Sequence, residues 1–411
     1  MQTYARTKYG CYLCSISLAA LSALSPLLFM TFMEQYHISY SQLGFLVLAN
    51  FCTQLLLELV LSLCEKHLNV KKLLTLMPLL IVIGLTVYSI GPLLYPRNAY
   101  PFLLVGTIFF SASSGFSEAL CSPVMAAIPA EHPDREMSRY HSVYAWGSVG
   151  VVLVNTLFLF FVGSQYWYIL ALLWTILPIA TTILFSGATI PDLHGSGEQK
   201  KGGFSFKDPL LLLFILSMFF GGAAEVTIAQ WCSGYVETAL GVEKLWGDLF
   251  GMALFSCMLG IGRVLYAARG KHIDRILLLS FLSATVCYIV AALTPYPIVG
   301  LLACAISGIC VAMLWPGNLI YVEKVIPTAG VAVYSLLACG GDLGASVVPQ
   351  LVGSITDAVK LSPYFADLAL HLGLTGDQIG LKVGFLVAGI FPLLGFFTLL
   401  ALYRRHKASI R

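Results

Sequence analysis

Charged residues are scarce in this chain. Asp, Glu, Lys and Arg make up only 10% of its 411 residues, whereas a soluble domain carries roughly a quarter. Hydrophobic residues account for 58% and form apolar runs almost end to end. A run of about 20 residues is enough for a helix to cross a hydrocarbon core about 30 Å thick. The lack of charge excludes a soluble domain, and the runs predict an integral membrane protein.

Several functional signals are also missing. The net charge is only +3 and no basic stripe carries interleaved aromatic residues, which argues against a nucleic-acid partner. No GxxxxGK[ST], HExxH or GxSxG pattern occurs and the histidines are dispersed, so we expect neither ATP hydrolysis, nor an enzyme, nor a cofactor. The eleven cysteines are odd in number and lie mostly in apolar runs. We interpret them, including the Cys11 and Cys14 pair, as small hydrophobic residues rather than a disulfide, redox or metal framework.

Twelve apolar runs, bounded by charged or turn residues, predict twelve transmembrane helices in an all-α fold. They lie near residues 10–33, 42–64, 73–94, 101–128, 141–163, 166–187, 209–236, 246–268, 275–294, 297–322, 329–353 and 380–403.

A polar, glycine-rich stretch separates the sixth run from the seventh and has the composition of a flexible linker. We therefore expect an N-terminal six-helix bundle over 1–187, a cytoplasmic linker over 188–208 and a C-terminal six-helix bundle over 209–411. We place the less apolar segment 361–379 outside the membrane, because its charged residues would be costly in lipid.

The distribution of basic residues predicts the orientation. Most lysines and arginines fall in the two termini and the even-numbered connections, and short loops rich in these residues stay in the cytoplasm. The first run lacks a small-residue cleavage site at the right distance, so we interpret it as a retained helix. The sequence predicts a multi-pass protein of the cytoplasmic membrane with both termini inside.

The two halves of the chain resemble each other. The segments SGFSEALCSP in the fourth run and SGICVAMLWP in the tenth both place Gly eight residues before Pro. The two segments lie 193 residues apart in the chain, and the same offset aligns Ser142 with Ser335 and Gly147 with Gly340. Two parallel six-helix halves are the plan of the major facilitator superfamily, whose solute path lies between them. The sequence therefore predicts two pseudo-symmetric bundles.

The chain resembles that superfamily over nearly its whole length, and within it looks most like the fucose-permease type. SGFSEALCSPVMAAIP, followed by YHSVYAWGSVG, carries the resemblance and places Glu118 and Pro123 on the family pattern. The resemblance implies that Glu118 faces the solute. The first-helix aspartate of fucose permeases falls near Pro26 and the fifth-helix asparagine near Tyr144, so fucose itself is not implied. The segment GSVGVVLVN in the fifth run lacks the proline of the drug-antiporter pattern, which argues against multidrug export.

Charged residues deep in apolar runs are the main candidate site residues, because lipid does not tolerate an exposed charge. Glu118 and Glu225 are predicted to contact the solute or to couple transport to a proton; a structural carboxyl is the alternative. Asn50, Gln54 and Glu58 recur every four residues and share one helix face. We assign Gln54 to solute contact and Glu58 to a gate.

Arg263 and Asp342 are opposite charges in the same half. We expect them to form a structural ion pair, with Arg263 as a clamp for a carboxylated solute as the alternative. Trp231 and Trp315 offer flat aromatic faces for a sugar ring or another amphipathic solute, with helix packing as the other interpretation. Tyr144 and Asn318 would add hydrogen-bonding groups.

These features favour a secondary active transporter. We expect it to move a small polar solute, sugar or sugar-like or else an organic anion, by alternating access and with proton coupling. Its partners would be the solute, the coupling proton and the lipid bilayer, and we expect a monomer. An exporter of amphipathic compounds and a non-transporting solute sensor with a transporter fold are the alternatives.

Overall fold

The computed structural model of the protein describes residues 4–64, 69–131, 133–191, 209–326 and 331–410. Over these ranges the backbone forms helices and connecting loops, with no strand. Twelve of the segments are long and apolar enough to cross a membrane. An all-helical chain is the physical solution for such a sequence, because a helix satisfies its own backbone hydrogen bonds where no water is present. The predicted all-α fold with twelve membrane-spanning helices is confirmed.

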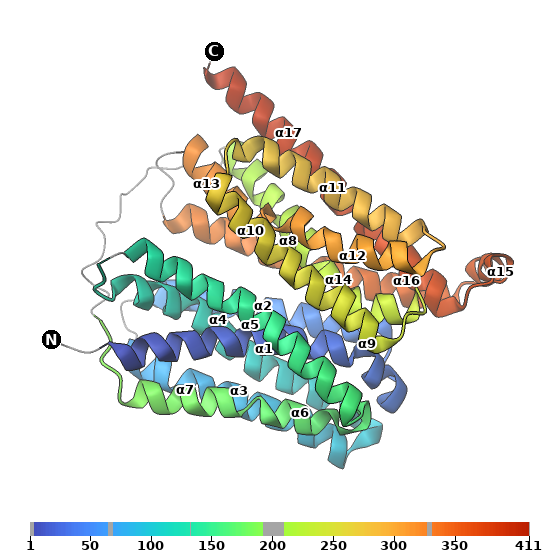
Figure 1. The fold of residues 1–411 in the computed structure, drawn as a ribbon, viewed down its shortest axis with the longest axis horizontal. Coiled ribbons are helices and arrows are strands. Elements are labelled where there is room, and N and C mark those ends of the chain that lie inside the picture. Colours follow the sequence, from blue (N-terminus) through green and yellow to red (C-terminus); the bar gives the residue numbers. More distant parts are fainter. Residues whose placement is uncertain (1–3, 65–68, 132, 192–208, 327–330, 411) are drawn as a thin grey trace. The chain divides into compact units, whose positions relative to one another are not determined.

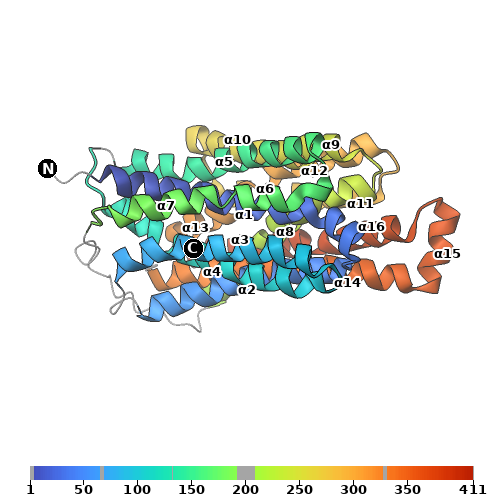
Figure 2. The same ribbon diagram turned by 90° about the horizontal axis from the view of Figure 1, so that it is seen from below.

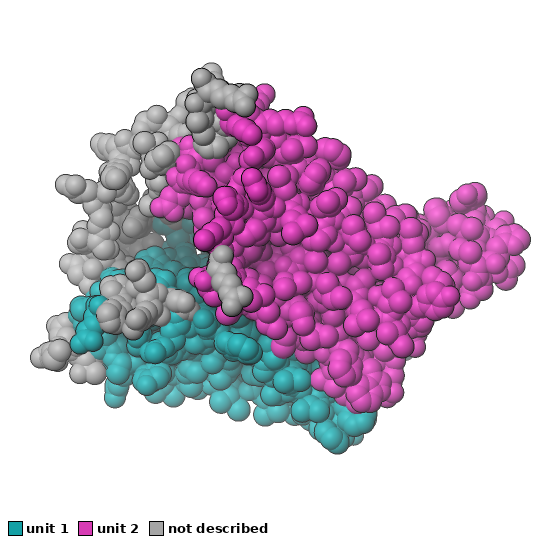
Figure 3. All heavy atoms as spheres, turned by 45° about the horizontal axis from the view of Figure 1, so that its top comes forward, with its two compact units in different colours: residues 1–38, 49–197 teal, residues 39–48, 198–411 magenta. Residues whose placement is uncertain are grey.

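The chain divides into two compact units, coloured separately in Figure 3: residues 1–38 with 49–197, and residues 39–48 with 198–411. The linker predicted over 188–208 lies mostly outside the described residues, and the domain boundaries expected at 187 and 209 stay a prediction. The apolar runs do not indicate that residues 39–48 group with the second unit.

The first unit contains six membrane spans (Figure 1). Its helices are α1 (Ala5–Tyr36), α2 (Tyr40–Cys64, which begins in the second unit), α3 (Val70–Leu94), α4 (Ala99–Ala127), α5 (Pro133–Phe161), α6 (Trp167–Leu173) and α7 (Ile176–Ser186). The sixth span consists of α6 and α7 together with a short 3-10 turn, Ser164–Tyr166.

The second unit contains the other six spans. Its helices are α8 (Pro209–Thr238), α9 (Lys244–Gly247), a π-helical turn (Asp248–Ala253), α10 (Leu254–Arg269), α11 (Ile273–Leu293), α12 (Pro297–Val311), α13 (Leu314–Val325), α14 (Val331–Leu361), α15 (Pro363–Leu372), α16 (Gly376–Ala388) and α17 (Ile390–Ile410).

Three spans are interrupted, and each interruption precedes a proline by three or four residues. A proline has no N–H for the carbonyl four residues earlier, so that carbonyl is left without its helical partner. The interruptions fall at 174–175 before Pro178, at 312–313 before Pro316 and at 389 before Pro392. The second of these interruptions takes part in the candidate site described below.

Glycine allows close helix packing in both units. In the first, a Cβ added to Gly84 of α3 would lie 2.8 Å from the backbone oxygen of Gly106 in α4. In the second, a Cβ added to Gly344 of α14 would clash with the backbone oxygen of Phe219 in α8. These helices approach closely only because no side chain lies between their backbones.

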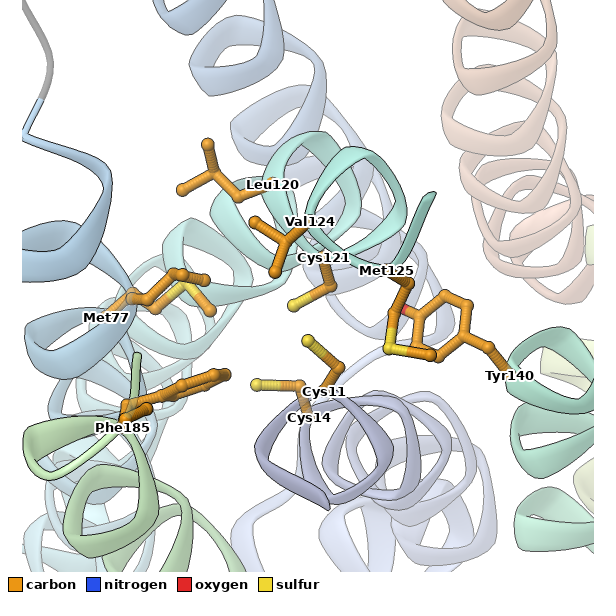
Figure 4. Packing of buried hydrophobic residues seen from close by; sticks show 11 residues of the cluster. Cys11, Cys14, Met77, Leu120, Cys121, Val124, Met125, Tyr140 and Phe185 are labelled. Carbon is orange, nitrogen blue, oxygen red and sulfur yellow. The ribbon is translucent and has the colours of Figure 1, made fainter. Parts of the chain in front are cut away.

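The core of the first unit contains three thiols. Cys11 and Cys14 of α1 and Cys121 of α4 are buried with apolar neighbours, and Figure 4 shows their sulfur atoms turned toward one another. They pack as small hydrophobic residues. Within the described ranges, no group of three or more His, Cys, Asp or Glu side chains is arranged to hold a metal ion.

The segment expected outside the membrane forms a helical hairpin. Helix α14 continues to Leu361, and the short helix α15 follows at the far end of α14 and α16 (Figures 1 and 2). Gly373, at a φ of 65°, ends α15, and Thr375 starts α16 with a capping box to Gln378. Lys360 and Asp377, 2.8 Å apart, pair across the base of this hairpin.

Candidate functional site

A line of polar side chains joins α2 to α4 in the first unit. Ser111 donates a hydrogen bond of 2.5 Å to Oδ1 of Asn50, and Nε2 of Gln54 donates to the same oxygen at 3.2 Å. One turn further along α4, Gly115 faces α2: an added Cβ would be 2.9 Å from the backbone oxygen of Gln54. The face of α2 expected from the four-residue spacing therefore packs on α4. Gln54 is buried, and its contact with a solute stays a prediction.

The same interface ends in two carboxyl groups. The side chains of Glu118 in α4 and Glu58 in α2 lie within reach of each other. Ionised carboxylates have only acceptor oxygens, so a hydrogen bond between the two groups forms only when one of them carries a proton. Glu118 is exposed and Glu58 half-buried. Since a charge facing lipid is costly, we infer that this Glu58–Glu118 pair borders water.

Tyr144 lies on α5 and connects it to α1. Its hydroxyl donates a hydrogen bond of 3.5 Å to Ser22, and its side chain is half-buried. The residue is positioned to offer a hydroxyl group, but its role toward a solute stays a prediction.

The second unit contains an ion pair within its membrane spans. Nη2 of Arg263 in α10 lies 3.0 Å from Oε1 of Glu225 in α8. Nε of Arg263 donates a second hydrogen bond, of 3.3 Å, to the backbone oxygen of Ala312. That carbonyl is free because Pro316, four residues later, has no N–H to donate. Arg263 thus binds both a carboxylate and the unpaired carbonyl at the break between α12 and α13.

The partner that the structure gives to Arg263 was not the one expected. The sequence predicts a pair of Arg263 with Asp342, and a role for Glu225 in solute binding or proton coupling. Asp342 is buried on α14, and its pairing with Arg263 stays a prediction. The position of Pro316 signals the free carbonyl of Ala312, but no sequence pattern shows which carboxylate reaches the guanidinium.

Trp315 packs against Gly341 of α14, a residue that also contacts α8. A Cβ added to Gly341 would be 2.6 Å from the Trp315 ring, and a Cβ added to Gly222 would in turn clash with the backbone oxygen of Gly341. Gly222 precedes Glu225 by one helical turn. The indole of Trp315 is half-buried, and its contact with a solute stays a prediction.

Trp231 and Asn318 lie deeper. Both side chains are fully buried. The indole N–H of Trp231 donates to the backbone oxygen of Pro349 at 3.0 Å, and Ser217 donates to Oδ1 of Asn318 at 2.7 Å. These contacts are typical of helix packing, and solute contact by either residue stays a prediction.

A further polar cluster in the second unit was not anticipated. Asp248 is 1% exposed and accepts a hydrogen bond of 2.5 Å from Ser233. Lys244 lies 3.2 Å from its other oxygen and 3.7 Å from Glu237. The four-residue spacing of Lys244 and Asp248 was the available signal. The cluster fixes the π-helical turn against α8.

Comparison with known proteins gives the family. A model described as Major Facilitator Superfamily matches residues 11–349, whereas a comparison with curated proteins gave no significant match. The fold resembles that of a bacterial homologue of the human lysosomal transporter Spinster, with a TM-score of 0.77, 13% identity and coverage of 98% of each chain.

Two other solved structures share the fold. A D-xylose-proton symporter has a TM-score of 0.76 and 12% identity, with 95% of this chain and 97% of that chain covered. A nucleoside transporter has a TM-score of 0.71 and 12% identity, with 97% of this chain and 100% of that chain covered. Identities this low show a shared fold alone. The family match over most of the chain and the twelve membrane spans together establish that this multi-pass membrane protein belongs to the Major Facilitator Superfamily.

Proposed function

We propose that the protein is a secondary active transporter that carries a small, sugar-like solute together with a proton by alternating access. Family membership supports transport. The observation that carries proton coupling is the closeness of the Glu58 and Glu118 carboxyl groups, because two such groups share a hydrogen bond only when one of them holds a proton. The xylose symporter and the nucleoside transporter named above have solutes rich in hydroxyl groups, which supports a solute of that kind here.

Glu118 is the proposed coupling carboxyl. Loss of the shared proton leaves two carboxylates side by side, and at about 4 Å their repulsion is roughly 4 kcal/mol at an effective dielectric constant of 20. The helices that bear them must then separate, or a hydrogen-bond donor must replace the proton. This links the protonation state to the packing of α2 on α4. Glu225 has a guanidinium partner and needs no proton, which favours Glu118 over Glu225 as the coupling site.

Other features complete the proposal. The position of Glu118 supports the fucose-permease type as the nearest subgroup. The distribution of basic residues supports the cytoplasmic membrane, with both termini inside, and we propose that the protein acts as a monomer. A map of accessible engineered cysteines tests the orientation, since accessibility of 188–208 from outside would refute it.

Transport by purified protein in proteoliposomes tests the coupling. Thermal-shift screening of sugars, nucleosides, organic acids and amino acids first selects the probe, because a bound solute raises the apparent stability. We expect Glu118→Gln to abolish accumulation driven by a pH gradient while sparing exchange of solute for solute. Glutamine retains hydrogen bonding to Glu58 but cannot exchange a proton.

Glu225→Gln is the matched comparison and should still accumulate a probe that it binds. Accumulation by Glu118→Gln equal to that of the unmodified protein, with the same pH dependence, would refute coupling at this site. Binding without any uptake or exchange by the unmodified protein would favour the solute sensor, and efflux of amphipathic compounds alone would favour the exporter.

A further inference from the structure

The ion pair between Arg263 and Glu225 leaves donor hydrogens on the guanidinium and one acceptor oxygen on the carboxylate for a solute. Arg263 uses Nε for the carbonyl of Ala312 and one Nη2 hydrogen for Glu225. The edge of the guanidinium formed by Nε and Nη2, one of those that can hold a carboxylate through two parallel bonds, is therefore occupied. The Nη1 hydrogens remain as donors.

Glu225 provides the matching acceptor. Its Oε1 binds Arg263, whereas its Oε2 is buried and accepts no hydrogen bond from any residue that the structure describes. An unmatched buried acceptor is unfavourable. A solute hydroxyl that donates to Oε2 would remove this cost, and a neighbouring hydroxyl could accept from Nη1 of Arg263. The pair thus offers one acceptor and one donor side by side.

The charges of the pair cancel. An incoming carboxylate would be attracted by Arg263 and repelled by Glu225, so it would gain little from the site while losing its hydration. An uncharged polyol does not bear this cost. The side chain of Arg263 is 34% exposed, and a guanidinium in a membrane span must meet water or protein rather than lipid. Trp315 of the same unit, whose ring lies against Gly341, adds an aromatic face on which a sugar ring can pack.

We propose that the Glu225–Arg263 pair selects the charge of the solute: it accepts uncharged solutes with adjacent hydroxyl groups and rejects their carboxylated counterparts. The proposal rests on the solute-binding role of the proposed function, but it does not depend on proton coupling at Glu118. Glu225 is a specificity-determining residue, because it neutralises an arginine that would otherwise bind anions.

Binding of matched pairs of probes to purified protein tests the proposal. D-Glucose and D-galactose are compared with D-glucuronate and D-galacturonate, which differ only in a carboxylate. We expect the unmodified protein to bind at least one of the hexoses at least tenfold more tightly than its uronate. Glu225→Gln leaves the charge of Arg263 uncompensated, so the ratio should move at least tenfold toward the uronate.

Two further variants separate specificity from loss of folding. Replacing both Glu225 and Arg263 by Gln removes both charges and should return the preference to the hexose. Glu243→Gln removes an exposed carboxylate elsewhere in the same unit and should leave the ratio unchanged. A preference of the unmodified protein for uronates, an unchanged ratio in Glu225→Gln, or no binding of either sugar class would overturn the proposal. Proton-driven uptake of a different solute would leave the proposed function standing.

Discussion

Substitution of Gly341 by alanine tests whether Trp315 contacts the solute. An added Cβ would lie 2.6 Å from the nearest ring atoms of Trp315, whereas carbon atoms pack at about 3.5–4.0 Å. The ring must therefore retreat by about 1 Å. The clash involves the far end of a side chain, so the helices themselves can remain in place. We expect a net loss of stability of about 0–2 kcal/mol, because an overpacking cost of about 1–3 kcal/mol is partly offset by the helix propensity of alanine, worth about 1 kcal/mol.

The affinity for the solute should change more clearly than the stability. Displacement of an aromatic face that packs on a sugar ring costs about 0.5–1.5 kcal/mol, so the dissociation constant should rise about 2- to 12-fold. Isothermal titration with the probe selected by thermal shift measures this change, and thermal unfolding measures the stability. A stability raised by about 1 kcal/mol, as the helix propensity of alanine alone would give, would refute the position of Trp315 against Gly341. Unchanged affinity with lowered stability would refute only its contact with the solute.

Two matched variants complete the test. A Cβ at Gly344 would clash with the backbone oxygen of Phe219, and backbone cannot move aside, so Gly344→Ala should lower folding yield and thermal stability. A Cβ at Gly260 would meet nothing within 4 Å. Gly260→Ala should therefore leave affinity unchanged and raise stability by up to about 1 kcal/mol. The opposite order of stabilities would contradict the packing of α14 on α8.

Two further predictions concern other parts of the chain. The sulfur atoms of Cys287 in α11 and Cys310 in α12 lie 3.9 Å apart, so a mild oxidant should join them in a disulfide. Peptide mass spectrometry would detect the bond as the loss of two hydrogens, which should be absent in Cys287→Ala. A protein that forms no cross-link would contradict the register of these two helices. The hydrogen bond from Lys8 lowers the pKa of Glu136, at the start of α5. The stability that this contact contributes is complete above about pH 4.3, the usual pKa of glutamate, and is lost as pH falls through the lowered pKa. The fall of the unfolding temperature at acid pH should therefore be less steep in Glu136→Gln. An unchanged acid dependence would contradict the contact.

The apolar runs predicted the membrane spans well, because the length of a span is set by the bilayer. The end of the eleventh span was the largest error, since α14 continues to Leu361 beyond the expected end at 353. Residues 354–361 are polar enough to suggest a loop, yet Thr356 is buried and its hydroxyl donates within the helix to Val352. Local polarity does not show whether neighbouring helices will cover a segment.

The candidate site was less predictable than the helices. Spacing along α2 correctly placed Asn50, Gln54 and Glu58 on one face, because helical periodicity is a local property. It could not show that Glu58 would meet Glu118, or that Arg263 would meet Glu225, since these contacts depend on how helices rotate and slide against one another. Opposite charge within one half of the chain does not identify the partner of Arg263, because that half contains more than one carboxylate.

The start of α2 is fixed by a carboxylate. Residues 40–48 of this helix belong to the second unit, where the Asp357 carboxylate accepts hydrogen bonds from the backbone N–H groups of Tyr40 and Ser41, at 3.3 and 2.7 Å, and residues 49–64 belong to the first. The helix is unbroken from Tyr40 to Cys64, so the first residues of α2 are held both by the backbone hydrogen bonds of the helix and by Asp357. Hydrogen bonds to a charged group contribute about 1.5–3 kcal/mol each, so these two bonds keep the start of α2 from fraying.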